Sequence, residues 1–166
     1  MAIVTKPLRE EHKELLPHIH QLRVAADGVG SFSVGQLQRE VNDALEFLFP
    51  HLLPHAQAEE AALYPVVQQV MGAPEATHTM IRDHVEIQRL TEELRTLGSA
   101  VETPLSDSTA RQLRRVLYGL YALVRVHFAK EEEVYLPLLD KHLSVGQAAE
   151  MFERMEAAAA SAKAKA

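Results

Sequence analysis

The sequence predicts an all-α protein, an up-down-up-down four-helix bundle followed by a short extra C-terminal helix. Alanine, leucine, glutamate and glutamine are abundant in the chain, and these residues favour helix over strand. Four long segments carry an apolar stripe whose residues recur in alternating steps of three and four, as in helices that pack in a bundle. Breaks that contain glycine or proline separate these segments, so we expect each segment to form one helix.

The first predicted helix runs from residue 7 to residue 26, between a candidate N-cap at Thr5 and a stop at Asp27-Gly28. Residues 33–36 (Ser-Val-Gly-Gln) have the pattern of a capping box, so a second helix begins there and continues to Met71. Pro50 and Pro54 lie inside this second helix. Since each proline removes a backbone donor, we expect a kink or short break just before His55.

The third and fourth predicted helices span residues 75–97 and 109–141, and the loop between them contains Pro104. A second capping-box pattern at residues 144–147 begins a short fifth helix. We therefore expect the bundle to occupy residues 1–143.

Residues 144–166 would then form a short C-terminal helix with a frayed tail. The segment 157–166 contains mostly alanine and lysine and has no apolar stripe for packing. The fifth helix could either cap the bundle or mediate a dimer, and the sequence leaves the oligomeric state open.

Composition excludes several classes of protein. The 166-residue chain has a net charge of −6 and no clustered basic face, which argues against a nucleic-acid partner. It contains no cysteine, so neither a disulfide framework nor a thiolate metal site can form. Its start lacks the apolar core of a signal peptide, and its richest apolar run, residues 116–128, is too short to cross a bilayer. We expect a cytoplasmic protein without a membrane partner.

Polar residues interrupt each of the four apolar stripes at a single level. A lone histidine in such a stripe is more often a hydrogen-bonded core residue than a metal ligand, but six polar residues at one level form a specific pattern. They are His12 in the first stripe, His55 and Glu59 in the second, His84 in the third, and His127 and Glu131 in the fourth.

A fixed offset relates these interruptions. His84, His127 and Glu131 each lie 72 residues after His12, His55 and Glu59, respectively. The chain therefore looks like two copies of a helical hairpin, each of which contributes a lone histidine and a His-x3-Glu pair.

Helix geometry gives this pattern a chemical meaning. Residues four apart lie one turn apart on the same helix face, so each His-x3-Glu pair points inward together. Two ionised carboxylates in an apolar core are unfavourable unless cations compensate them. Imidazole and carboxylate ligands suit iron, manganese or zinc, and bundle cores host such pairs of ions. The spacing therefore predicts a two-metal site whose ligands are His12, His55, Glu59, His84, His127 and Glu131.

These motifs resemble the hemerythrin-like, or HHE cation-binding, family over about residues 5–141. The matching residues are Glu11-His12, His55 to Glu60, Asp83-His84 and His127 to Glu132, with Tyr-Pro and Tyr-Leu-Pro after the two acidic pairs. The resemblance implies two iron ions with an oxo or hydroxo bridge. It also implies a small diatomic or peroxide ligand. Members of the family bind or sense dioxygen or iron, handle nitric oxide or peroxide, or store iron.

The chain departs from the oxygen-carrying members at two positions. The position four after His84 is Gln88, so the fifth histidine of those proteins is missing, and Glu131 replaces an aspartate that lies five residues after its histidine. Two six-coordinate metals offer about twelve positions, of which these ligands and a bridge leave about two open. Two open positions suit a ligand that bridges or reacts, although a further side chain or water could fill either of them.

Four other residues are candidates for the pocket or for an extra ligand: His51, Gln88, Tyr64 and Tyr135. His51 precedes His55 by four residues, and Tyr64 and Tyr135 follow the two glutamates by about one turn. For both tyrosines, core packing with a hydrated hydroxyl is the alternative. We expect Glu60, Glu132 and Glu133 to be solvated charges on the helix surface.

The leading hypothesis is a non-haem di-iron protein that binds or turns over dioxygen, hydrogen peroxide or nitric oxide. Catalase-like peroxide chemistry or nitric oxide chemistry would take place at the irons, so no separate catalytic residue is assigned. The alternative is a non-catalytic module that binds or senses oxygen or iron. A ferritin-like carboxylate site is disfavoured, because it needs Glu-x2-His on two helices and the chain has only Glu75-x2-His78.

Overall fold

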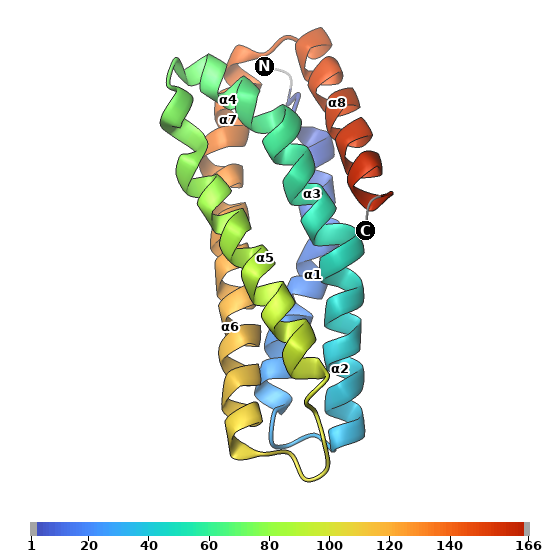
Figure 1. The fold of residues 1–166 in the computed structure, drawn as a ribbon. Coiled ribbons are helices and arrows are strands. Elements are labelled where there is room, and N and C mark those ends of the chain that lie inside the picture. Colours follow the sequence, from blue (N-terminus) through green and yellow to red (C-terminus); the bar gives the residue numbers. More distant parts are fainter. Residues whose placement is uncertain (1–2, 165–166) are drawn as a thin grey trace.

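A computed structural model describes residues 3–164 of the chain (Figure 1). Within these residues every regular element is helical, as the sequence predicts. The first and third bundle helices are α1 (Lys6–Gly28) and α5 (His78–Gly98), the latter preceded by a 3₁₀ turn, η3 (Pro74–Thr77). The C-terminal helix is α8 (Val145–Lys163).

The second and fourth bundle helices are each built from several consecutive segments. The second contains α2 (Val34–Phe47), η1 (Leu48–Leu52), α3 (Leu53–Ala58), η2 (Glu59–Leu63) and α4 (Tyr64–Met71). The fourth contains α6 (Asp107–Lys130), η4 (Glu131–Tyr135) and α7 (Leu136–His142). The segments η1, η2 and η4 are π-helical turns, in which the helix widens without breaking.

Proline explains where these π turns lie. In each case the last N–H before a proline donates to the carbonyl five residues back: Leu53 to Leu48, Tyr64 to Glu59, and Leu136 to Glu131. The prolines that follow are Pro54, Pro65 and Pro137. A proline ring collides with the carbonyl four residues back, and a wider turn relieves that collision. The break expected before His55 is therefore a π turn inside a continuous helix.

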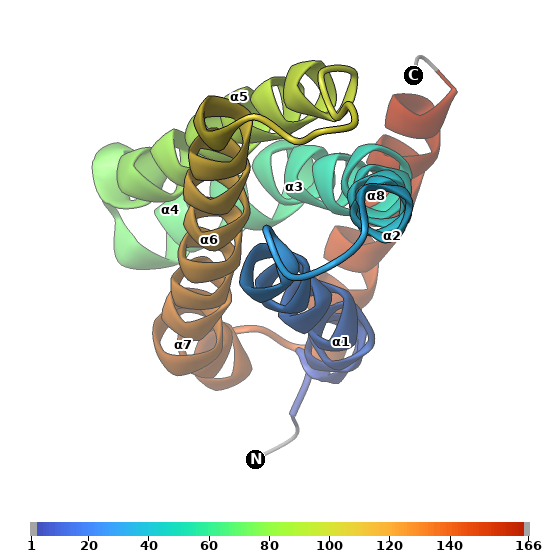
Figure 2. The ribbon, with the colours of Figure 1, turned by 90° about the horizontal axis from the view of Figure 1, so that it is seen from below.

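The four bundle helices run side by side, and α8 lies outside them (Figures 1 and 2). Helix α1 packs on α6 and α2, α5 packs on α6 and α2, and α8 packs on α3 and η2. The interior contains two apolar clusters. One includes Ile19, Leu48 and Leu94, and the other includes Leu8, Leu63 and Leu136.

Helix α8 is longer and better packed than its composition suggests. Ser144 and Gln147 form the predicted capping box, with both reciprocal hydrogen bonds present. Met151 and Met155 are buried in the second apolar cluster, so α8 covers its own bundle. The tail expected to fray from residue 157 continues as helix to Lys163, while residues 165–166 lie outside the described part of the chain.

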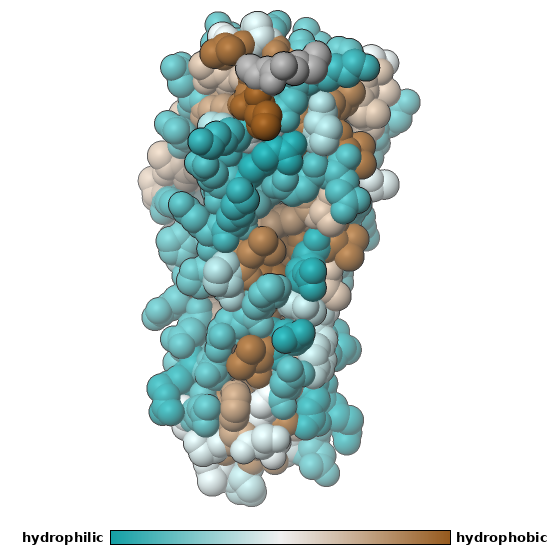
Figure 3. Space-filling model, turned by 180° about the vertical axis from the view of Figure 1, so that it is seen from behind, coloured by the Kyte–Doolittle hydropathy of each residue, from teal (hydrophilic) through white to brown (hydrophobic). Residues whose placement is uncertain are grey.

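The surface of the bundle is mostly hydrophilic, in contrast to its apolar interior. Hydrophilic residues cover most of the face in Figure 3, and hydrophobic residues form small separate groups on it. None of the helices formed by residues 3–164 is long and apolar enough to cross a membrane.

Candidate metal centre

The structure brings the six predicted ligands together in the bundle interior. His12 lies on α1, His55 on α3, His84 on α5 and His127 on α6, while Glu59 and Glu131 begin the π turns η2 and η4. All six side chains are buried; both glutamates are 0% exposed and the most exposed histidine, His84, is 6% exposed. They therefore form one polar layer inside an otherwise apolar core.

Two groups of donor atoms share one carboxylate. His12, His55 and Glu59 form one group, and Glu59, His84 and His127 form the other, with the ligand atoms of each group within 4.8 Å of one another. Glu59 Oε1 lies 2.9 Å from His55 Nε2, and Glu59 Oε2 lies 3.4 Å from His84 Nε2. The two oxygens of a single carboxylate thus face histidines of opposite hairpins.

Glu131 occupies the corresponding place on the other side of the layer. Its Oε2 lies 3.4 Å from His12 Nε2, and its Oε1 lies 3.5 Å from His127 Nε2. Both carboxylates therefore connect the two halves of the cluster, as the 72-residue repeat requires. This arrangement has the composition of a binuclear site.

Several buried polar atoms of the cluster make no well-directed hydrogen bond, although His55 Nε2 and Glu59 Oε1 lie 2.9 Å apart. These atoms are His12 Nε2, His55 Nε2, both oxygens of Glu59, and Glu131 Oε2. An unsatisfied buried polar group costs about 1–3 kcal/mol, and a buried carboxylate costs more. Metal cations between these atoms would satisfy all of them, so the side chains present fit a pair of metal ions.

Each of the four histidines also contacts a carboxylate through its outward-facing nitrogen. Nδ1 of the imidazole donates to the acid at 2.7–3.0 Å in all four cases: His12 to Glu132, His55 to Glu11, His84 to Glu60, and His127 to Asp83. Such an acceptor fixes the tautomer that leaves Nε2 free to bind a metal.

Glu60 and Glu133 are exposed, as predicted, and Glu132 is partly exposed. The prediction missed that Glu60 and Glu132 each accept a hydrogen bond from a ligand histidine. Glu60 and Glu132 each lie one residue after a ligand glutamate, so their side chains point toward the adjacent helix. There each carboxylate accepts from Nδ1 of a histidine that belongs to the other hairpin. The repeat contained the signal for this role. Acidic residues stand before both lone histidines and after both ligand glutamates, at the same 72-residue offset.

Neighbouring carboxylates raise the pKa of two of the four histidines. Burial alone would lower the pKa of His55, but the Glu59 carboxylate and Glu11 raise it to about 10. Burial likewise opposes protonation of His127, and hydrogen bonds to Asp83 and the ligand glutamates raise its pKa to about 11. In both cases the neighbouring carboxylates outweigh burial and favour the protonated imidazole. Metal binding requires neutral imidazoles, so metal ions replace these protons.

Tyr64 reaches the cluster and Tyr135 does not. The Tyr64 hydroxyl donates to Glu131 Oε1 at 2.9 Å and lies 3.3 Å from Nε2 of both His84 and His127. The Tyr135 hydroxyl donates to the Ala76 carbonyl instead. Both glutamates begin a π turn, in which the residue five positions after the glutamate, rather than four, takes the place one turn further along the same face. Tyr64 is the fifth residue after Glu59.

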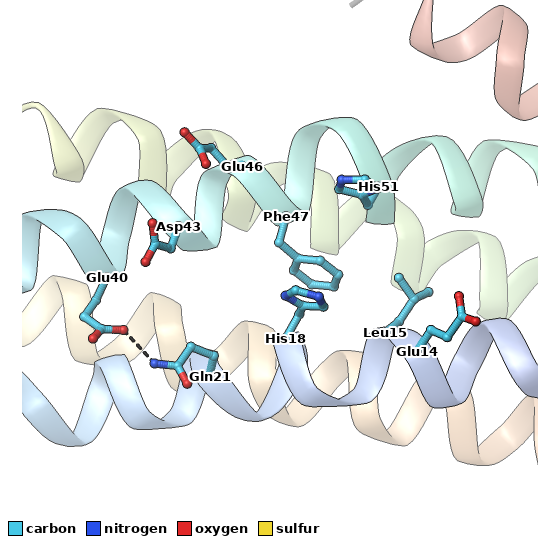
Figure 4. Close-up of a pocket in the computed structure, with 9 residues that line it drawn as sticks. All are labelled: Glu14, Leu15, His18, Gln21, Glu40, Asp43, Glu46, Phe47 and His51. Carbon is cyan, nitrogen blue, oxygen red and sulfur yellow. Dashed lines mark hydrogen bonds between the residues drawn. The ribbon is translucent and has the colours of Figure 1, made fainter.

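The structure places Gln88 away from the layer, whereas His51 lines a pocket that also reaches the ligand His55. Gln88 is exposed and lines a surface groove with Phe49 and Arg95. His51 is exposed at one end of a groove between α1 and α2, as Figure 4 shows. That groove has a volume of about 590 Å³ and contains four acidic residues and His18, which stacks on Phe47. Neither His51 nor Gln88 belongs to the two donor groups.

Comparison with known proteins gives one match. The family model described as the hemerythrin HHE cation binding domain matches residues 4–139, and it matches again over residues 75–165. The two matches begin 71 residues apart, close to the offset of the internal repeat. No curated protein and no solved structure matches the chain.

Proposed function

The chain belongs to the hemerythrin HHE cation-binding domain family, and from this membership we propose that it holds two iron ions and binds or turns over a small oxidant. The oxidant would be dioxygen, hydrogen peroxide or nitric oxide. The ligands would be the six buried residues His12, His55, Glu59, His84, His127 and Glu131. The observation that carries this proposal is the pair of mirrored His-His-Glu groups, which share a fully buried carboxylate.

The donor set supports two cations rather than one. Each of the two histidine pairs belongs to a donor group of its own, and the carboxylates face both pairs. Imidazole and carboxylate ligands suit iron, manganese and zinc, so iron follows from the family more than from the ligands. When bound, two iron ions supply Lewis acidity and electrons for reaction with a small oxidant.

The protein's own residues prepare the site for this chemistry. The four outer carboxylates hold the imidazoles with Nε2 pointing inward, and the apolar clusters on either side exclude water from the layer. Tyr64 places a hydroxyl at the half formed by His84 and His127. The equivalent position of the repeat, 72 residues on, is Leu136, so the half formed by His12 and His55 has no such hydroxyl.

A non-catalytic role in binding or sensing oxygen or iron is the second candidate. Among the described residues, the acid–base side chains of the cluster are the ligands, their outer carboxylates and Tyr64. In that part of the chain no further acid or base belongs to the cluster, and this favours the non-catalytic role. Catalase-like or nitric oxide chemistry would have to proceed at the metal ions themselves.

An oxygen electrode separates the two candidates. Iron-loaded protein is mixed with hydrogen peroxide, and peroxide decay and oxygen evolution are followed, with metal-free protein as the control. Turnover that depends on iron supports an enzyme. Nitric oxide or azide binding without turnover of any tested oxidant supports the non-catalytic module. Failure to bind or consume any of them would contradict both.

A further inference from the structure

A second feature near the metal centre is a pocket between α1, α3 and α8. It has a volume of about 250 Å³, and one of the residues that line it is the ligand His55. The other walls come from the N-terminal part of α1, from His51 on η1, from Ala58 on α3, and from one face of α8. The pocket thus extends from the surface to a buried ligand, and the C-terminal helix forms one side of it.

The pocket has an apolar interior and a charged rim. Leu8, Ala58, Phe152 and Met155 provide the apolar walls. Among residues 3–164, the charged residues that line the pocket are Glu11, Glu156 and Lys163. Apolar walls favour a small neutral molecule over an anion.

We propose that this pocket is the route by which a small neutral molecule reaches the His12–His55 half of the metal centre, and that α8 sets the width of the route. The inference rests on the proposed function in one respect: the metal centre that the molecule reaches at the end of the pocket is the proposed one. The existence of the route itself does not require a bound metal.

The two halves of the centre differ in whether a protein hydroxyl lies beside the histidines, and this difference supports the direction of approach. His12 Nε2 and His55 Nε2 make no well-directed hydrogen bond, whereas Nε2 of both His84 and His127 lies against the Tyr64 hydroxyl. A molecule that arrives past His55 therefore meets the half of the centre that no protein hydroxyl occupies.

A rival approach lies on the opposite side, between α1 and α6. That pocket is lined by His12 and Phe128, with Arg9 and Glu132 among its other residues. The Phe128 ring stacks on His12 with centroids 4.1 Å apart, and Arg9 forms an ion pair with Glu132. The stacked ring covers the imidazole, and the ion pair ties α1 to η4 beside it. This pocket has a volume of about 310 Å³, but the stacked ring shields one face of the His12 imidazole from it.

A cysteine-free chain allows each pocket to be blocked separately. Ala159→Cys places one thiol at the α8 pocket, and Ala129→Cys places one at the rival pocket as a matched control. Both variants are labelled with the same bulky maleimide and loaded with iron. The rate of nitric oxide association is then measured by stopped-flow absorbance, with the unlabelled variants as folding and metal-content controls.

We expect the label at Ala159→Cys to slow nitric oxide association by about tenfold or more, and the label at Ala129→Cys to leave the rate unchanged. Slowing by the Ala129→Cys label alone, or by neither label, would overturn the proposal.

A second readout is independent of metal. Crystals of the metal-free protein under xenon pressure should show a xenon atom between Leu8, Ala58 and Met155. An empty pocket under xenon would contradict the route even if two metals bind. Conversely, a protein that binds xenon there but takes up no iron would contradict only the proposed function.

Discussion

The Glu59 carboxylate faces histidines from both hairpins, with Oε1 toward His55 and Oε2 toward His84. Glu59→Gln replaces one oxygen with an amide donor and removes the charge that both cations need. We predict that metal content falls from about two ions per chain to below one, measured by plasma mass spectrometry. The neighbouring variant Glu60→Gln is the control, because Glu60 only orients His84. It should still bind metal, with an affinity roughly 10–100-fold weaker. Equal metal content in the two variants would argue against Glu59 as a ligand.

Tyr64 and Tyr135 form a second matched pair. Tyr64→Phe removes the hydroxyl beside His84 and His127, whereas Tyr135→Phe removes one that contacts the Ala76 carbonyl. Each change should cost the metal-free protein about 1 kcal/mol for one lost buried hydrogen bond. With iron bound, only Tyr64→Phe should change the affinity for azide or nitric oxide, by about tenfold or more. Titrations that give both variants the affinity of the wild type would remove Tyr64 from the site.

At the scale of elements, the π turns decide which residues face the centre. Periodicity and the 72-residue repeat were sufficient to predict the helices and to pick out the six polar residues that the structure gathers in one layer. They did not predict the π turns, because the periodicity was read with the α-helical repeat throughout. With that repeat, the residues after Glu59 and Glu131 are assigned to a different helix face from the one they occupy in the structure. The proline two residues beyond the end of each turn could be seen in the sequence, but a proline in a helix is equally consistent with a kink. The outer carboxylates were missed because their role depends on contacts between helices.

Two glycines test helix packing away from the centre. A Cβ on Gly98 would lie 2.9 Å from Val41 Cγ1, so α5 could not keep its approach to α2. A Cβ on Gly119, inside α6, would make only an ordinary contact with Leu90 at 3.5 Å. Gly98→Ala should therefore destabilise the fold by about 1–3 kcal/mol. Gly119→Ala should stabilise it by about 0.5–1 kcal/mol, since glycine is unfavourable in a helix interior. Urea unfolding of the metal-free variants measures both, and equal effects would contradict the packing described.

At the scale of the whole molecule, the polar layer joins two hairpins that each supply half of the site. Ligands that bind only the folded chain add about 4 kcal/mol of stability at a thousandfold excess over Kd. For a chain of this size we expect iron loading to raise the melting temperature by roughly ten degrees. The metal-free protein should remain folded, because the two apolar clusters on either side of the layer pack without metal. Circular dichroism melts before and after chelation measure both effects, and identical melting temperatures would indicate a bundle that binds no metal.

The most direct test of a two-metal centre is the metal content of the purified protein after anaerobic iron loading, together with its visible and near-ultraviolet absorption. The six buried donors predict about two irons per chain. They also predict near-ultraviolet bands of a bridged pair of irons, which change when peroxide, azide or nitric oxide is added. Protein that takes up little or no metal under these conditions would contradict the assignment. The buried atoms of His12, His55, Glu59 and Glu131 that make no well-directed hydrogen bond would then need another explanation.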